Sequence, residues 1–183
     1  DWSSDVCSSD LNAYRIWNDL AAEDDLAAMR NVAQLLRQGK GVEKDVQRAF
    51  KLYTEAAEKG LVTAMANVGD MYMTGEGVTR NPEAAAAWYA RAASAGLSLA
   101  QWKLADMYAS GTGVAKDPER SRALLERAAR NGYAPAQAKL REMGITVISE
   151  DEEAKRAARV AESAAAKTDE ARTAAGATDK KGA

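Results

Sequence analysis

The tetrapeptide pattern GxGV occurs three times in this sequence: GKGV at residues 39–42, GEGV at 75–78 and GTGV at 111–114. Successive copies begin 36 residues apart, and several other positions recur with the same period. These positions are the glycines Gly60, Gly96 and Gly132, the alanine pairs Ala56–Ala57, Ala92–Ala93 and Ala128–Ala129, and the polar residues Asp45, Asn81 and Asp117. Because many independent positions share one period, the chain is predicted to be an array of similar structural repeats.

Each unit is expected to fold as two helices. In the middle copy, apolar residues at helical spacing predict a first helix over residues 62–73. The glycines of GxGV then end this helix, because glycine accepts the positive φ that a helix end requires. Asn81 is placed to cap the second helix, with Pro82 in its first turn and Gly96 at its end. The small alanines predict that the paired helices approach each other closely.

The period also predicts how the chain is divided. Residues 12–25 are expected to form the second helix of a truncated repeat, because their apolar residues align one period before those of the next second helix. Three full repeats would follow at 26–61, 62–97 and 98–133. A final capping helix would occupy residues 134–148, because a terminal repeat must cover its apolar face.

The two ends of the chain do not follow the period. Residues 1–11 resemble a translated sequencing adapter of the kind found in metagenomic assemblies; otherwise they are typical of a disordered polar terminus. If they are not native, the natural N-terminus and any signal peptide would be missing. Residues 149–183 form an Ala-rich charged tail that is expected to be partly helical and then disordered.

The composition of the chain argues against catalytic, metal-binding and nucleic-acid-binding sites. The chain has no histidine and a single cysteine, Cys7, which removes the usual metal ligands and the general base of a Ser-His-Asp triad. A formal net charge of -2 provides no basic field for a phosphate backbone. No apolar run approaches the roughly 20 residues that cross a bilayer. We therefore expect no enzymatic activity, no catalytic, cofactor-binding or metal-binding residues, and no nucleic-acid partner.

The repeats resemble the Sel1-like repeats, which are related to TPR repeats. The pattern is A-x-x-x-L-G-x-x-Y-x-x-G-x-G-V, then an acidic or amide residue, then A-x-x-W-Y-x-x-A-A-x-x-G. The middle copy carries the match at Ala64, Val68, Gly69, Tyr72, Gly75, Gly77, Val78, Asn81, Ala85, Trp88, Tyr89, Ala92, Ala93 and Gly96.

The resemblance implies an all-α, right-handed α-solenoid whose concave face is lined by the first helices. It also implies adaptor or scaffold work and a bacterial origin, without choosing between cytoplasm and periplasm. The repeats contain none of the cysteines that pair in one subgroup of the family. The chain is therefore expected to act as a monomeric adaptor that binds a partner peptide or helix on this face. The alternative is a structural or cell-envelope spacer within a larger protein.

Variable positions of the first helices are the candidate partner-binding residues. Trp102 stands out because its column otherwise holds Arg30, Ala66 and Ala138, so the fold does not require an aromatic residue there. It is either a binding hot spot or a side chain packed sideways between neighbouring helices. Among the other candidates, the column of Asn67 and Lys103 is amide or basic, and the column of Asp70 and Asp106 is acidic or amide. Together these columns could clamp an extended peptide backbone, or they form an ordinary solvated helix surface. The full set of candidates is Asn67, Asp70, Met71, Trp102, Lys103 and Asp106.

Overall fold

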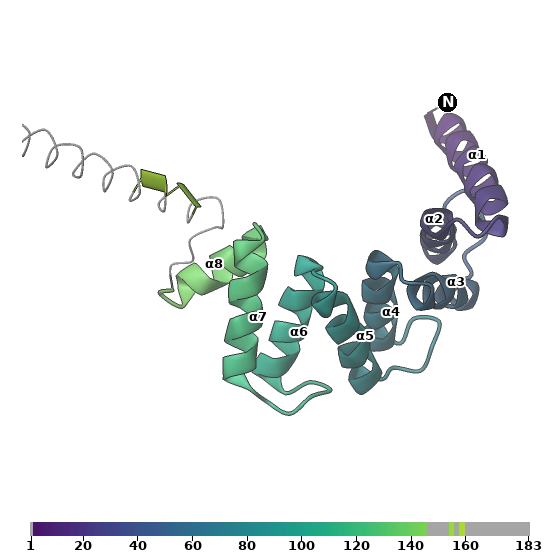
Figure 1. Cartoon of the computed structure of the whole chain (residues 1–183). Helices are drawn as coiled ribbons and strands as arrows, with labels where there is room; N and C mark the ends of the chain where they lie inside the picture. The colour runs from purple at the N-terminus through teal and green to yellow at the C-terminus, as the bar shows by residue number, and fades with distance from the viewer. Residues whose placement is uncertain (1, 146–153, 156–157, 160–183) are drawn as a thin grey trace, which may run out of the picture.

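The structure is a computed structural model that describes residues 2–145, 154–155 and 158–159, with side chains described from Ser9 onward. The helices follow one another along an arc (Figure 1), and each packs mainly against its neighbours in sequence, as in a solenoid. The described residues contain no strand, and their eight main helices are α1 (Trp2–Ala22), α2 (Leu26–Gln38), α3 (Val46–Glu58), α4 (Val62–Thr74), α5 (Pro82–Ser94), α6 (Ser98–Ser110), α7 (Pro118–Arg130) and α8 (Ala134–Glu142). The predicted all-helical solenoid is confirmed.

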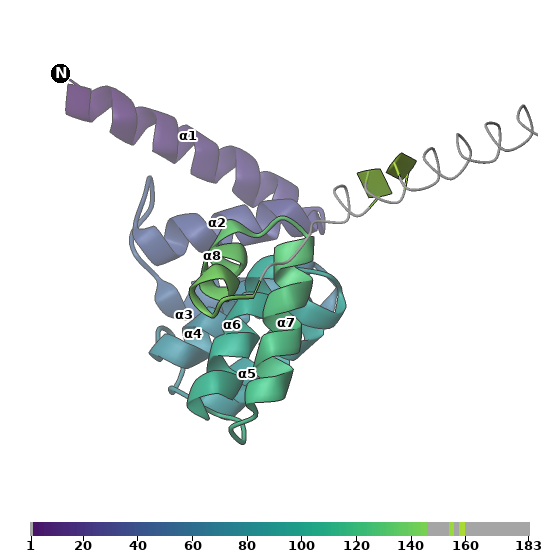
Figure 2. The ribbon, with the colours of Figure 1, turned by 90° about the vertical axis from the view of Figure 1, so that its left-hand side faces the viewer.

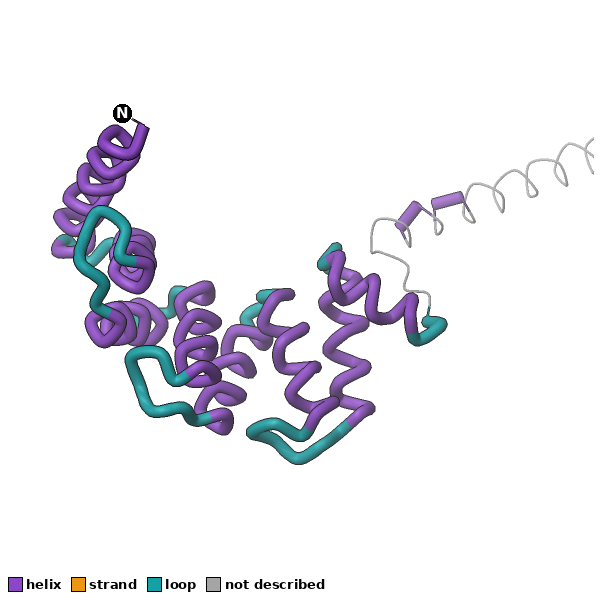
Figure 3. The backbone as a smooth tube through the Cα atoms, turned by 180° about the vertical axis from the view of Figure 1, so that it is seen from behind, coloured by secondary structure: helices purple, strands orange, loops and turns teal. Residues whose placement is uncertain are grey.

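Helices α2, α4 and α6 are the first helices of the three repeats, and α3, α5 and α7 are the second helices. Long loops join the two helices of a repeat, whereas short turns join one repeat to the next (Figure 3). The second helices begin where the sequence places caps, because each capping side chain accepts a hydrogen bond from the backbone N–H three residues later. These caps are Asp45, Asn81 and Asp117.

The second glycine of each GxGV loop lies against the repeat before it. A Cβ atom on Gly77 would lie 2.3 Å from the carbonyl oxygen of Val46, at the start of α3. A Cβ atom on Gly113 would lie 2.4 Å from the carbonyl carbon of Pro82, at the start of α5. Both glycines also have positive φ, +74° and +70°. The loop is therefore a joint between repeats that only glycine fits.

Helix α1 differs from the sequence expectation. It begins at Trp2 rather than near residue 12, so the residues for which disorder was one interpretation are helical from Trp2 onward. The physical reason is that no glycine or proline occurs between residues 2 and 22 to stop the helix. Asp24, one period before Gly60, has a φ of +66° and takes the place of that glycine. The α1 helix thus occupies the position of a second helix (Figure 2).

At the other end, α8 covers the first part of the expected capping segment. Its backbone turns at Gly144, which has a φ of +72°. Residues 146–148 and nearly all of the tail lie outside the described residues. The exceptions are residues 154–155 and 158–159, which are helical and exposed.

The core runs through the array where paired helices touch. The alanines Ala57, Ala93 and Ala129 are all buried, as close helix approach requires. Buried side chains also join one repeat to the next. The amide nitrogen of Gln101 on α6 donates to the backbone oxygen of Ala93 at 3.2 Å. This bond fixes α6 against α5, the second helix of the preceding repeat.

Candidate binding groove on the first helices

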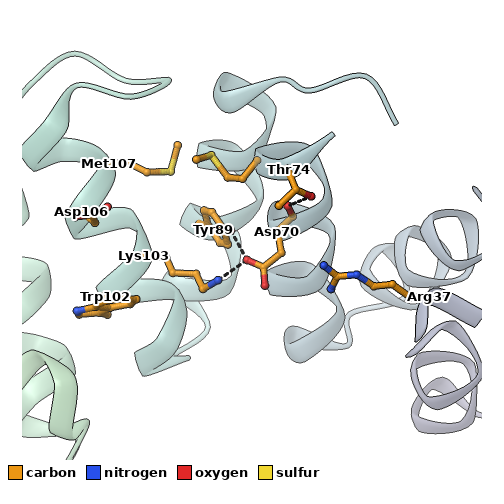
Figure 4. A pocket seen from close by; sticks show the side chains of 9 residues that line it. Arg37, Asp70, Thr74, Tyr89, Trp102, Lys103, Asp106 and Met107 are labelled. Atoms are coloured by element: carbon orange, nitrogen blue, oxygen red, sulfur yellow. Dashed lines mark hydrogen bonds and ion pairs between the residues drawn. The ribbon is translucent and has the colours of Figure 1, made fainter. Parts of the chain in front are cut away.

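A pocket of about 360 Å³ lies across the first helices of all three repeats. Helix α2 contributes one residue, and α4 and α6 contribute most of the others; Tyr89 reaches the pocket from α5 (Figure 4). We call this pocket the groove. Its lining residues are Arg37, Asp70, Met73, Thr74, Tyr89, Trp102, Lys103, Asp106 and Met107.

Asp70 is the centre of a polar network in the groove. Its Oδ1 atom accepts a hydrogen bond from the Tyr89 hydroxyl and a second one from the Lys103 ammonium, 2.5 Å away. Lys103 belongs to the following repeat, and its Nζ atom also lies 5.6 Å from the centre of the Tyr89 ring. About a quarter of each charged side chain is exposed, 25% for Asp70 and 26% for Lys103. The network therefore fixes two opposite charges while leaving both accessible.

Tyr89 reaches Asp70 because the facing position on α4 is a glycine. A Cβ atom on Gly69 would lie 2.7 Å from the Tyr89 ring, too close for any side chain to fit without a shift. Tyr89 is itself buried. Burial raises the pKa of the Tyr89 hydroxyl well above its usual value of 10.0, and the hydrogen bond to the Asp70 carboxylate raises it further. The hydroxyl consequently remains a donor that orients Asp70.

Arg37 enters the groove from the other side, at the last turn of α2. Its Nε atom lies 2.7 Å from Oε2 of Glu76, a residue of the GEGV loop in the next repeat. Lys44 lies farther from the same carboxylate, at 3.9 Å. Two ion pairs, Arg37–Glu76 and Lys103–Asp70, therefore each link neighbouring repeats along the groove.

Trp102 has features of both sequence interpretations. Its ring packs 6.1 Å from the ring of Tyr133, in the turn before α8, with the two planes tilted by 54°. It is partly buried and also lines the groove. One part of the indole therefore supports the last repeat, while another is available in the groove.

Four of the six candidate residues are brought together in the groove: Asp70, Trp102, Lys103 and Asp106. Asn67 is partly buried on α4, one turn before Asp70, and does not line the groove. Met71 must be corrected, because its side chain is 0% exposed and belongs to the core. One step along a helix turns a side chain by about 100°, which carries Met71 from the groove into the interior.

Arg37, Met73, Thr74 and Tyr89 also line the groove and were missed in the sequence. Arg37 and Met73 are one period apart, so extending the candidate face by a turn would have found both. Tyr89 gave no such signal, because it belongs to a second helix and its column otherwise holds Tyr53 and Leu125, which are buried.

Within residues 2–145 and the two short described segments beyond them, no three His, Cys, Asp or Glu side chains are grouped so that they could hold a metal ion. None of the described helices combines the length and the apolar character needed to cross a bilayer.

Comparisons with solved structures give several related solenoids. A Sel1 repeat protein from Oxalobacter formigenes is 32% identical, with a TM-score of 0.63 over 66% of this chain and 49% of that one. A protective antigen from uropathogenic Escherichia coli, which displays an SLR fold, is 30% identical, with a TM-score of 0.68 over 76% of this chain and 31% of that one. The chain thus spans about half and about a third of their lengths.

A more distant structure supports the fold alone. The cysteine rich protein B of Helicobacter pylori is 21% identical, with a TM-score of 0.59 over 74% of this chain and 97% of that one. No curated protein sequence matches the chain. A family model described as Sel1 repeat matches residues 26–61, 62–97 and 98–133. Because these matches cover more than half of its residues, the chain belongs to the Sel1 repeat family.

Proposed function

We propose that this chain is a non-catalytic adaptor that binds a segment of a partner protein, as a peptide or a helix, in the groove formed by α2, α4 and α6. Sel1 repeat proteins are generally protein-interaction scaffolds, and repeats of this type are generally non-catalytic. The observation that carries the proposal is a single pocket lined by the first helices of three consecutive repeats.

The chemistry of the groove suits a protein ligand. Met73 and Trp102 are partly exposed and offer apolar and aromatic surface, and both aromatic and methionine side chains are enriched at interfaces. Three of the four charged residues of the groove, Arg37, Asp70 and Lys103, are held by ion pairs before any partner arrives. Such preorganisation favours binding, since less side-chain entropy is lost when the complex forms.

A structural or cell-envelope spacer is the alternative function. Two facts favour it: the main contacts run only between successive helices, and the chain spans 49% and 31% of two related proteins. In a spacer the groove would have no ligand of its own, and substitutions in it would alter nothing that the chain binds.

A peptide selection distinguishes the two functions. The full chain is immobilised and screened with a random peptide library displayed on phage. Enriched peptides are then measured against a groove variant, Asp70→Ala with Trp102→Ala and Asp106→Ala. The control variant carries Glu83→Ala and Glu119→Ala, two exposed carboxylates on the second helices α5 and α7. Circular dichroism establishes that all three proteins are folded.

The adaptor function predicts peptides that bind the native chain and the control variant equally and lose most of their affinity for the groove variant. Peptides that bind all three proteins equally would move the site away from the groove. A selection that enriches no peptide would contradict the adaptor function and favour the spacer.

A further inference from the structure

We infer that the groove recognises a cationic side chain, a lysine or arginine on the partner segment, with Asp106 as its counter-ion. This inference rests on the proposed adaptor function and specifies the chemistry of the partner at the same site. The inference is based on which charged side chains in the groove already form ion pairs and which do not.

Four charged residues line the groove, and the two cations are already paired. Arg37 is 2.7 Å from the Glu76 carboxylate, and Lys103 is 2.5 Å from Asp70. Asp106 is exposed, and no described cation lies within ion-pair distance of it. The unpaired charge in the described groove is therefore negative. An incoming cation could pair with Asp106 without breaking an existing ion pair.

The second carboxylate of the groove has spare capacity as well. Tyr89 and Lys103 both donate to Oδ1 of Asp70, while no described donor is hydrogen-bonded to Oδ2. A carboxylate can accept on both oxygens. The groove therefore contains two carboxylates with unused acceptor oxygens, Asp106 and the Oδ2 side of Asp70.

The ends of the helices add to the negative potential. Met73 and Thr74 lie in the last turn of α4, and Met107 lies in the last turn of α6. Helix C-termini carry partial negative charge and are stabilised by nearby cations. Neither α4 nor α6 has a basic residue in its last turn. Arg80 donates to the Met73 carbonyl at 3.0 Å. At the end of α6, the helix of Asp106, Arg120 lies 5.8 Å from the centre of the Tyr108 ring, and no described Arg or Lys donates to a carbonyl there.

The apolar lining suits the rest of a lysine or arginine side chain. Long basic side chains pack their methylene stems on apolar surface while the charged head stays near water. Trp102 lies on the same helix as Asp106, and the partly exposed Met73 lines the same pocket from α4. An indole face also attracts a cation directly.

An anionic partner does not fit this arrangement. A carboxylate or phosphate would have to compete with Glu76 for Arg37 or with Asp70 for Lys103. It would also lie close to Asp106, where like charges repel. The same groove that accepts a cation therefore disfavours an anion.

The test uses the ¹⁵N-labelled full chain and three capped pentapeptides. Each peptide has four alanines around one central residue, which is arginine, norleucine or glutamate. Binding is followed by the indole N–H signal of Trp102, which is assigned by its absence in Trp102→Phe. The arginine peptide is expected to shift this signal saturably, with an affinity at least about threefold above that of the norleucine peptide and with a preference that weakens at higher salt. The glutamate peptide is expected to bind weakest.

Matched variants locate the charge that is recognised. Asp106→Asn should lower the affinity for the arginine peptide at least about threefold and leave the norleucine peptide unaffected. Glu142→Gln removes the carboxylate of the same column in α8, where it pairs with Lys139 outside the groove, and should change nothing. Well-dispersed spectra of both variants establish that they are folded.

Three results would overturn the inference. A preference for the glutamate peptide would reverse the sign of the recognised charge. Equal binding of all three peptides would leave the adaptor function standing without charge recognition. An arginine peptide that never shifts the Trp102 signal would rule out a cation site here, and the peptide selection would then decide separately whether the groove binds any protein segment.

Discussion

The α4–α5 pair and the α6–α7 pair have the same design but differ at the contact between their helices. In α4–α5, a glycine, Gly69, faces the large ring of Tyr89. One period later the corresponding residues are Ala105 and Leu125, both buried. The first helix gains a methyl group where the second helix loses an aromatic ring. Volume is thus exchanged across the contact, and both pairs stay filled.

This exchange in the core changes the surface of the groove. The Tyr89 hydroxyl passes Gly69 and bonds to Asp70, so that carboxylate is anchored. Leu125 has no polar atom to offer Asp106, the equivalent residue of the next repeat. The groove therefore contains one anchored carboxylate, Asp70, and one unpaired carboxylate, Asp106. The difference between them follows from the core residues Tyr89 and Leu125.

The largest effect is expected at a feature that the two pairs share. Gly77→Ala and Gly113→Ala should each lower the free energy of unfolding by about 2–4 kcal/mol, because each combines a positive φ with a Cβ clash against the preceding repeat. Urea denaturation measures both. Gly96→Ala is the control: its φ is +93°, but its Cβ would meet nothing within 4 Å, so it should cost only about 1–2 kcal/mol. Equal costs at all three glycines would contradict the role of the loops as joints.

The alanine columns are also shared and should respond alike. Ala93→Leu on α5 and Ala129→Leu on α7 each overpack a buried contact and should cost about 1–3 kcal/mol. Thermal denaturation is sufficient to detect this. A melting temperature that stays unchanged in either variant would show that the contact there is looser than the structure indicates.

The next prediction concerns the residues that differ. Gly69→Ala should cost about 1–2 kcal/mol, because the overlap with the Tyr89 ring outweighs the better helix propensity of alanine. Adding Tyr89→Leu reproduces the α6–α7 pairing and should recover much of that loss. A double-mutant cycle of denaturation free energies measures the coupling. Additive costs would mean that the two positions do not exchange volume.

Removing only the Tyr89 hydroxyl tests the hydrogen bond between the core and Asp70 in the groove. Tyr89→Phe should cost about 1 kcal/mol at neutral pH through the lost hydrogen bond to Asp70. Because the pKa of Tyr89 is raised on folding above 10.0, its bound proton stabilises the fold below that pH and the stabilisation is lost at higher pH. The native chain should therefore lose more unfolding free energy than Tyr89→Phe between about pH 9 and about pH 11. Parallel losses in the two proteins would contradict this coupling.

The smallest effect is expected for the ion pair across the repeats. A cycle of Asp70→Asn and Lys103→Met should give a coupling energy of at most about 1 kcal/mol, because about a quarter of each side chain remains exposed. The coupling should shrink as salt is raised. A larger, salt-independent value would indicate that the pair is far less accessible to solvent than its exposure implies.

Features set by local sequence could be predicted. The caps Asp45, Asn81 and Asp117 and the glycines of GxGV act within a few residues, and their repetition made each one visible several times. The groove was predicted less completely. To separate Met71 from Asp70, the rotation of α4 must be known to within one residue. A helix such as α4, with apolar residues on several sides, does not define that rotation from its sequence.

The ion pairs between repeats were not predicted from the sequence. The Arg37–Glu76 pair joins residues 39 positions apart, and its partners occupy different structural columns, so no periodic pattern indicates it. The start of α1 was missed for a different reason. A helix without a glycine or proline to stop it continues past the residue where the repeat pattern begins.

In the proposed function, the first helices form the face on which a partner binds. The most direct test maps the tightest peptide from the phage selection onto the ¹⁵N-labelled chain through its backbone amide shifts. If a partner binds in the groove, the largest shifts are expected on α4 and α6 around Asp70, Thr74, Trp102 and Asp106, with smaller shifts near Arg37. Largest shifts on the second helices α3, α5 and α7 would contradict it.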